Sequence, residues 1–201
     1  EVAKYVVQRN ELGGSAEQRR LEIPHRSKSV KVRLSGGTNE VVIKSSTFGG
    51  DWRSRNGELM VNNAENGPRL LAKKLNLANF DLEVDIMVDD ESQAGVVFRV
   101  DHAGTGIDAY RGYYAGLHGA KQRVMWGAAL PGWKEIARRN TPVAPDKWHQ
   151  LRVEARGESV RIFLNGEKRI EGTDARLKAG LLGFRSLGNK ARFRNLVVTA
   201  N

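Results

Sequence analysis

The chain lacks features that would place it in several classes of protein. Its 201 residues include no cysteine, which excludes disulfides and thiolate metal sites. No apolar run approaches the ~18 residues of a membrane-spanning helix, and no segment sustains a helical periodicity. The first residues, Glu1 to Lys4, have no basic-then-apolar signal pattern, so we expect an export signal to be absent or already removed. These absences indicate a soluble chain with no membrane span.

Positive charge is in excess but dispersed. The 33 basic residues outnumber the 23 acidic ones and give a net charge of +10. Most of them alternate with apolar neighbours, as in Val30 to Leu34, and the densest clusters are pairs such as Arg138-Arg139. This distribution is typical of solvated strand faces, so we expect no nucleic-acid partner. An anionic glycan is an intermediate alternative.

Short strand-like segments recur about every ten residues from Thr47 to the end of the chain. The segment Phe80 to Val88 has the clearest pattern, because its apolar residues alternate with Glu83 and Asp85. A later pair, Asn165-Gly166, is typical of a type I′ hairpin turn. Many short strands without helices predict an all-β fold, a two-sheet antiparallel β-sandwich.

Residues 1–45 are too few to bury a core of their own. They contain one predicted hairpin, in which residues 30–34 and 41–44 flank the glycines Gly36 and Gly37. We expect residues 1–45 to be an N-terminal extension or the tail of an upstream β domain. Residues 46–201 are then the main domain.

Six segments, in order along the main domain, resemble the concanavalin A-like and laminin-G-like jelly rolls. They are residues 79–85, 94–100, 108–117, 147–153, 160–166 and 180–185. The tandem of GVVFR, DAYRGYYAGL and a following tryptophan is most similar to carbohydrate-binding module family 66. Modules of that family accompany fructan-cleaving and other glycoside hydrolases and recognise terminal sugars. The resemblance therefore implies a jelly roll that binds a glycan.

Polar residues that alternate with apolar ones are expected to line the outer face of a sheet. Arg99 follows Phe98 in this way, and the strand adjacency implied by the resemblance places it near Glu83 and Asp85. Carboxylates and a guanidinium can together hold vicinal hydroxyl groups of a sugar. The alternative is a salt-bridged sheet face, which is nearly neutral in energy.

Aromatic rings can give a sugar a stacking platform. Tyr113 and Tyr114 must point to opposite faces of a strand, so at most one of the two belongs to the core. Trp133 follows a Pro-Gly turn and is our favoured platform, Trp126 is undecided, and Trp148 reads as core. Near these residues Tyr110 is flanked by the loop residues Asp108 and Arg111, which we place at the rim of the site or, as the alternative, in a solvated loop.

The sequence offers no clear catalytic set. Glu83 and Asp85 begin the E-x-D-x-x-E pattern of laminarinase-type glycosidases, but Val88 stands where the second glutamate is needed. The four histidines have no metal-ligand spacing. We therefore assign no catalytic residue, no metal ligand and no cofactor, although analogy with the fold admits a structural Ca²⁺ ion.

We expect a non-catalytic carbohydrate-binding module of a larger secreted or cell-envelope glycoside hydrolase, recognising terminal sugars of a polysaccharide or oligosaccharide. Its other partners would be further domains of the same polypeptide. One alternative is a glycoside hydrolase that acts on a disaccharide or polysaccharide through the same cleft. Another is a laminin-G-like domain that binds a protein or a polyanion. The predicted carbohydrate-binding residues are Glu83, Asp85, Arg99, Asp108, Tyr110, Arg111, Tyr114, Trp126 and Trp133.

Overall fold

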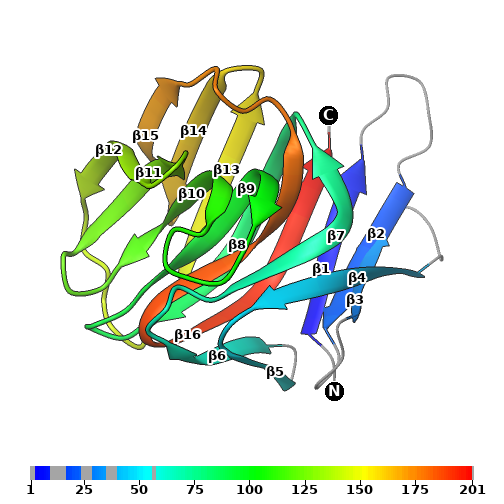
Figure 1. Ribbon diagram of the computed structural model, residues 1–201, viewed down its shortest axis with the longest axis horizontal. Helices are drawn as coiled ribbons and strands as arrows, with labels where there is room; N and C mark the ends of the chain where they lie inside the picture. Colours follow the sequence, from blue (N-terminus) through cyan, green and yellow to red (C-terminus); the bar gives the residue numbers. More distant parts are fainter. Residues whose placement is uncertain (1–2, 10–16, 24–28, 35–39, 56–57, 201) are drawn as a thin grey trace.

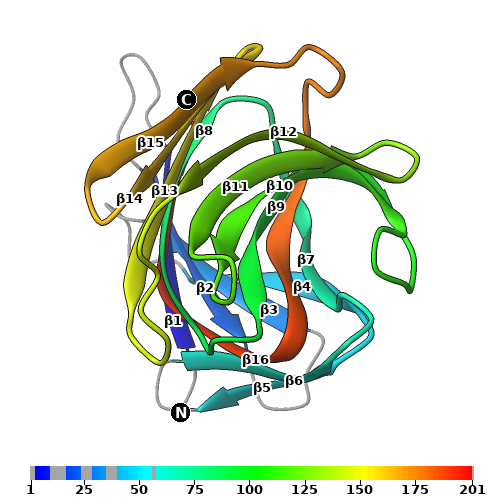
Figure 2. The ribbon, with the colours of Figure 1, turned by 90° about the vertical axis from the view of Figure 1, so that its left-hand side faces the viewer.

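Every regular element in the described part of the chain is a β-strand, as the sequence predicts. A computed structural model describes residues 3–9, 17–23, 29–34, 40–55 and 58–200. Within these ranges the strands form two layers packed face to face (Figure 1, Figure 2). The described residues include no helix long and apolar enough to span a membrane.

One layer, called here the β10 sheet, carries the candidate site. Its strands run antiparallel in the order β4-β7-β16-β9-β10-β11-β12. The strand bounds are β4 (Glu40–Phe48), β7 (Arg69–Leu77), β16 (Gly180–Ala200), β9 (Gln93–Ala103), β10 (Tyr110–His118), β11 (Arg123–Ala129) and β12 (Trp133–Asn140).

The opposite layer is called here the β8 sheet. Its strands run antiparallel in the order β5-β6-β16-β8-β13-β14-β15. The strand bounds are β5 (Asp51–Arg55), β6 (Glu58–Ala64), β8 (Phe80–Val88), β13 (His149–Arg156), β14 (Ser159–Leu164) and β15 (Glu167–Thr173).

The N-terminal strands extend both layers. β1 (Ala3–Arg9), β2 (Glu17–Ile23) and β3 (Ser29–Leu34) form an antiparallel meander that continues into β4. β1 also pairs in parallel with the end of β16, and β4 pairs with β7. The predicted hairpin of β3 and β4 is confirmed, whereas its glycine turn lies outside the described residues. The division of the chain at residue 45 stays a prediction.

The last strand, β16, belongs to both sheets. Its first half pairs Phe184 with Val96 of β9, and its second half pairs Phe193 with Ile86 of β8. Between them Gly188 takes a φ of 108°, which a residue with a side chain rarely adopts. Because both halves face the interior, the rings of Phe184 and Phe193 meet at 4.6 Å between centroids.

The core lies between the layers and follows the predicted alternation. On β8 the residues Leu82, Val84 and Ile86 are at most 2% exposed, while the acidic residues between them are half-buried. Each such aliphatic side chain contributes about 1.5–3 kcal/mol of burial free energy. The two-sheet β-sandwich is therefore confirmed, and its period-two pattern also determines which side chains reach the outer faces.

Candidate functional site

A second cluster of apolar and aromatic side chains covers the outer face of the β10 sheet. It includes Val97, Tyr114 and Met125 from three neighbouring strands, with Trp133 packed against it. These residues alternate with core residues, so the same strands supply both faces. The β9–β10 loop, residues 104–109, lies over this outer face (Figure 1) and projects from it in the side view (Figure 2). The site forms where the loop meets the cluster.

Arg69 of β7 fastens that loop to the sheet. Its Nη1 donates to the carbonyls of Gly67 and Ile107 at 2.8 and 3.0 Å, and its Nη2 donates to those of Gly104 and Gly106 at 2.6 and 2.8 Å. The side chain is 0% exposed, and its burial lowers the pKa to about 10, which still leaves it charged at neutral pH. Arg69 therefore positions the loop and has no donors directed to solvent.

Arg185 of β16 is the second buried guanidinium of the site. Only 3% of the residue is exposed, and its Nη2 lies 3.2 Å from the Ile107 carbonyl and 3.4 Å from Oδ1 of Asp108. The guanidinium carbon lies 5.2 Å from the ring centre of Tyr114 and 6.0 Å from that of Trp133. Its Nε is buried and has no hydrogen-bond partner among the described residues. Arg185 thus has weak partners and an unused donor.

Tyr110 and Tyr114 form the floor beneath these arginines. Both are buried, and neither phenolic oxygen has a partner within the described part of the chain. Burial raises the pKa of Tyr110 to about 12 and raises that of Tyr114 further, so both hydroxyls keep their protons at neutral pH. Arg69 covers the ring of Tyr110 at 4.9 Å, and Arg185 covers that of Tyr114. Neither ring offers an open stacking face.

Trp133 is the aromatic wall of a groove of about 240 Å³. The half-buried indole lies over Gly127 on β11, where a Cβ atom would come within 2.4 Å of the ring. It meets Tyr114 edge to face at 5.9 Å. The groove is also lined by Ile107, Asp108, His118, Arg123, Met125 and Arg185.

His118 and Arg123 form the far end of the groove, where β10 and β11 meet. Partial burial lowers the pKa of His118, and the charges of Lys121 and Arg123 lower it further, so the imidazole is neutral at pH 7. Nδ1 of His118 and Nε of Arg123 are buried without partners among the described residues. Arg123 reaches Glu135 only at 3.6 Å. This end of the groove therefore holds further unsatisfied polar atoms.

The structure brings four of the predicted site residues together. Asp108, Tyr110, Tyr114 and Trp133 all lie within the groove or directly beneath it. Arg111 is on the adjoining rim, where it is exposed and lies 3.4 Å from Asp101. Whether any of these residues contacts a sugar stays a prediction.

The predicted placement of Arg99 is wrong. Its φ is 51°, and the register between β16 and β9 shifts at this point, so the alternation of β9 is interrupted. The side chain is 1% exposed and donates to the carbonyls of Ala78, Gly157 and Leu177 at 2.7–2.9 Å. Arg99 therefore ties three loops together and is not on the outer face of the sheet.

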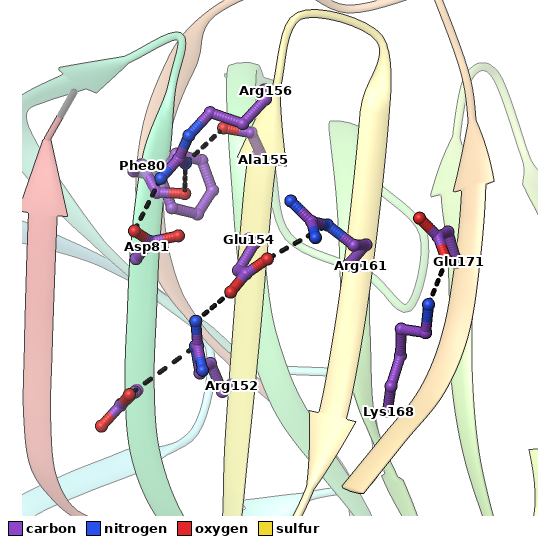
Figure 3. A network of polar contacts seen from close by, with 10 residues as sticks. Phe80, Asp81, Arg152, Glu154, Ala155, Arg156, Arg161, Lys168 and Glu171 are labelled. Carbon is purple, nitrogen blue, oxygen red and sulfur yellow. Dashed lines mark hydrogen bonds and ion pairs between the residues drawn. The ribbon is translucent and has the colours of Figure 1, made fainter. Parts of the chain in front are cut away.

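The predicted placement of Glu83 and Asp85 beside the site is also wrong. Both lie on β8, which pairs with β13 and β16 and not with β9. Glu83 lies 3.7 Å from Arg152, and Asp85 accepts hydrogen bonds from Arg194 and Asn195. They belong to the outer face of the β8 sheet, where ion pairs run across neighbouring strands (Figure 3).

Trp126 is a core residue and not a platform. It is 0% exposed and packs against Tyr113 at 6.0 Å between ring centroids. As predicted, Tyr113 and Tyr114 point to opposite faces, with Tyr113 in the core. Trp148, predicted as core, is instead half-buried on the side of the β8 sheet, with the guanidinium of Arg194 at 4.1 Å from its ring centre.

Four residues of the site were not predicted from the sequence: Arg69, His118, Arg123 and Arg185. Arg185 carries a recognisable signal, because it follows the core residue Phe184 in an alternating strand just as Arg99 follows Phe98. Its distance along the chain from Trp133 hides their proximity in space. Arg69, His118 and Arg123 have no comparable signal, since each stands at a strand end.

The described residues include no group of three or more metal-ligating side chains that could hold a metal ion. The structural Ca²⁺ ion that analogy with the fold admits stays a prediction.

A family model described as the 3-keto-alpha-glucoside-1,2-lyase-like domain matches residues 39–199. No curated protein sequence matches the chain. The family match spans the main domain and the end of the N-terminal segment.

Among solved structures, the chain is similar to the carbohydrate-binding module CBM66 from Bacillus subtilis. The TM-score is 0.70 at 23% identity, over 77% of this chain and 94% of the module. A Bacillus subtilis protein of unknown function with a galectin-like fold has a TM-score of 0.63 at 13% identity, over 77% of this chain and 88% of that one. The lumenal domain of VIP36, bound to Ca²⁺ and Man3GlcNAc, has a TM-score of 0.55 at 11% identity, over 75% and 84%. The predicted resemblance to a jelly roll of the family 66 type is confirmed for the fold.

Proposed function

Because the chain belongs to the 3-keto-alpha-glucoside-1,2-lyase-like domain family, we propose that it binds a carbohydrate in the groove beside Trp133. The observation that carries this proposal is the groove itself. It combines an accessible indole with a carboxylate, Asp108, and a weakly partnered guanidinium, Arg185. The carbohydrate-binding module CBM66 from Bacillus subtilis supports the proposal through its similar fold.

The groove chemistry suits one sugar ring. The C–H face of a ring can pack on Trp133 while its hydroxyls remain polar. Asp108 can accept hydrogen bonds from hydroxyls, and Arg185 can donate to them. Ile107, at 45% exposure the large hydrophobic residue most open to solvent in the described chain, can cover the ring from the loop side.

The size of the groove favours a terminal sugar. Its volume of about 240 Å³ is below the roughly 300–1,000 Å³ of a pocket for a drug-sized ligand. A single ring at the end of a glycan chain fits that limit better than an internal stretch of several sugars. We expect weak affinity per site, since one ring buries little area and its hydroxyls must lose water.

We propose that this binding is non-catalytic. Glycoside hydrolysis uses two carboxyl groups on either side of the scissile bond. Asp108 is the one carboxylate among the described residues that line the groove. A classical glycosidase mechanism therefore has no second partner there.

A second candidate function is a lyase reaction on a 3-keto glucoside, and His118 is the observation that favours it. A ketone at C3 makes the C2 proton acidic, so a neutral imidazole can remove it. The C1–O bond then breaks, the enone forms, and the leaving oxygen takes a proton. A donor such as Arg185 can stabilise the negative charge that develops on the C3 oxygen.

The binding proposal is tested by titrating mono- and oligosaccharides into the purified chain and its Trp133→Ala variant. We expect the substitution to reduce affinity at least tenfold, because the stacking surface is removed. Trp148→Ala is the matched control, since that indole is also half-buried but lies on the side of the β8 sheet. Equal loss in both variants, or no binding by the parent chain to any sugar, contradicts the proposal.

The lyase alternative is tested by incubating the chain with a 3-keto glucoside and recording the absorbance of the enone. The non-catalytic proposal predicts that the enone absorbance increases no faster than in the uncatalysed reaction. Product formed by the parent chain but not by a His118→Ala variant would replace it with the lyase function.

We also propose that the chain serves as an accessory module of a larger glycoside hydrolase that acts outside the cytoplasm. The lectin-like and carbohydrate-binding neighbours support this setting. Detection of the chain, with an antibody, in the culture medium or cell envelope of its source organism tests the location.

A further inference from the structure

Positive charge dominates the Trp133 groove. Among the described residues that line it, Lys121, Arg123 and Arg185 are cationic, whereas Asp108 is the one carboxylate. The buried cation Arg69 lies just behind, and its lowered pKa reflects burial first and the charge of Arg185 next. The groove therefore holds more positive than negative charge in a partly desolvated place.

The cations of the groove lie farther from their nearest carboxylates than two arginines of the β8 sheet do. On the β8 sheet, Arg156 lies 2.6 Å from Asp81 and Arg161 lies 3.1 Å from Glu154. In the groove, the corresponding distances are 3.4 Å from Arg185 to Asp108 and 3.6 Å from Arg123 to Glu135. Net charge alone does not explain this, because the chain has the carboxylates to pair arginines well elsewhere.

Two donors in the groove remain buried and unsatisfied. Nε of Arg123 and Nε of Arg185 are both hidden from solvent and have no partner among the described residues. A buried donor without an acceptor carries a desolvation penalty. Arg69 adds to this positive charge, and its Nη atoms already donate to carbonyls of the β9–β10 loop. An anionic oxygen of a ligand beside these guanidinium groups would supply the missing negative charge.

Resting on the proposed function, we propose that the sugar bound in this groove is acidic. Its oxyanion, a uronate carboxylate or a sulfate ester, lies against Arg185 and Arg123 while its ring packs on Trp133. Both groups carry the negatively charged oxygen atoms that the groove lacks. The ligand is a single acidic sugar and not an extended polyanion, because the groove accommodates one ring.

The experiment compares methyl glucuronide, methyl glucoside and methyl glucoside 6-sulfate by calorimetric titration into the whole chain at fixed ionic strength. The first two differ at C6, where a carboxylate replaces a hydroxymethyl group. We expect an acidic sugar to bind about tenfold more tightly than the neutral one, the effect of one charge-assisted hydrogen bond. If methyl glucoside 6-sulfate binds more tightly than methyl glucuronide, the charged group is a sulfate ester. If the glucuronide binds more tightly, the charged group is a uronate carboxylate.

Variants distinguish specific contacts in the groove from non-specific attraction between a basic protein and an acidic sugar. Arg123→Gln should remove most of the preference for the acidic sugar, because one of the two cations against its oxyanion is lost. Arg161→Gln is the matched control, since it removes one positive charge from the β8 sheet. Arg185→Gln gives a second test, with thermal unfolding measured first because this residue is buried.

The outcomes distinguish the two proposals. Equal affinity for acidic and neutral sugars, with binding still lost in Trp133→Ala, overturns the acidic-sugar inference and leaves carbohydrate binding in place. Equal weakening by Arg123→Gln and Arg161→Gln also overturns it, since the attraction is then non-specific. Absence of binding to any of the three sugars and to the broader sugar set removes the proposed function and this inference together.

Discussion

The two outer faces of the sandwich use arginine in opposite ways. On the β8 sheet, Arg152 forms ion pairs with Glu83 and Glu154 in a row that crosses the strands (Figure 3). On the β10 sheet, Arg69 and Arg185 are buried among aromatic rings, and Arg185 keeps an unused donor. Charges that are paired within a sheet contribute to a stable surface. Charges that are buried and left short of partners indicate where a ligand completes the structure.

The largest expected effect is a loss of stability when a buried arginine of the β10 sheet is replaced. Arg69→Met removes the side chain that holds the β9–β10 loop through several carbonyls. We expect the free energy of unfolding to fall by about 3–5 kcal/mol, because buried acceptors lose a charged donor. Urea denaturation measures the change. A loss below about 1 kcal/mol would mean that the loop is held by other contacts and that the face is not built as described.

Arg99 gives the next largest effect and lies on neither face. Arg99→Met leaves the carbonyls of Ala78, Gly157 and Leu177 without their donor. We expect a loss of about 2–3 kcal/mol, smaller than for Arg69 because water can reach some of these loops. Sugar binding should stay unchanged in the remaining folded protein. A variant with normal urea unfolding and no sugar binding would restore Arg99 as a binding residue.

Arg99 also illustrates how far sequence alternation can be taken. Leu82, Val84 and Ile86 lie in the core as predicted, because β8 continues without a break and the period of two holds along it. The same rule fails at Arg99, where β9 has a positive φ and the pairing with β16 changes register. Such a bulge depends on a strand far along the chain, so the local pattern could not predict it.

In the candidate site, too, some residues could be predicted from local sequence and others are brought there only by the tertiary structure. Asp108 and Trp133 could be predicted from a loop position and a turn, which are local features. Glu83 and Asp85 lie away from the site, because β8 is in the other sheet and the strand adjacency implied by the resemblance does not hold. Arg185 alternates recognisably with Phe184, but only tertiary structure brings it to Trp133.

Asp174 is a carboxylate at the edge of the sandwich, where it contacts both the core residue Tyr113 and the surface residue Arg176. Burial raises the pKa of Asp174, but hydrogen bonds from Arg176 and the core residue Tyr113 outweigh it and lower the pKa from 3.8 to about 2. Because the folded pKa lies below the unfolded one, Asp174 stabilises the fold above about pH 4. That stability is lost as the pH falls towards 2.

We expect this contribution to be about 1–2 kcal/mol after allowance for solvent screening. It is measured by urea unfolding of the parent chain and of Asp174→Asn at pH 7 and pH 2.5. The difference between the two proteins should shrink at the lower pH. A difference that is the same at both pH values would show that Asp174 acts through its hydrogen-bond geometry and not through its charge.

The smallest expected effect on stability is that of replacing an exposed, ion-paired arginine of the β8 sheet. Arg152→Met removes an arginine that is 39% exposed and pairs with Glu83 and Glu154. Since water can solvate the half-buried Glu83 and Arg161 still pairs with the buried Glu154, we expect a loss below about 1 kcal/mol, largely removed by salt. Urea unfolding at low and high ionic strength measures the loss of stability and its dependence on salt. A loss as large as that of Arg69→Met would mean that the ion pairs of Figure 3 are as necessary to the fold as the buried arginines, and the contrast between the two outer faces would then fail.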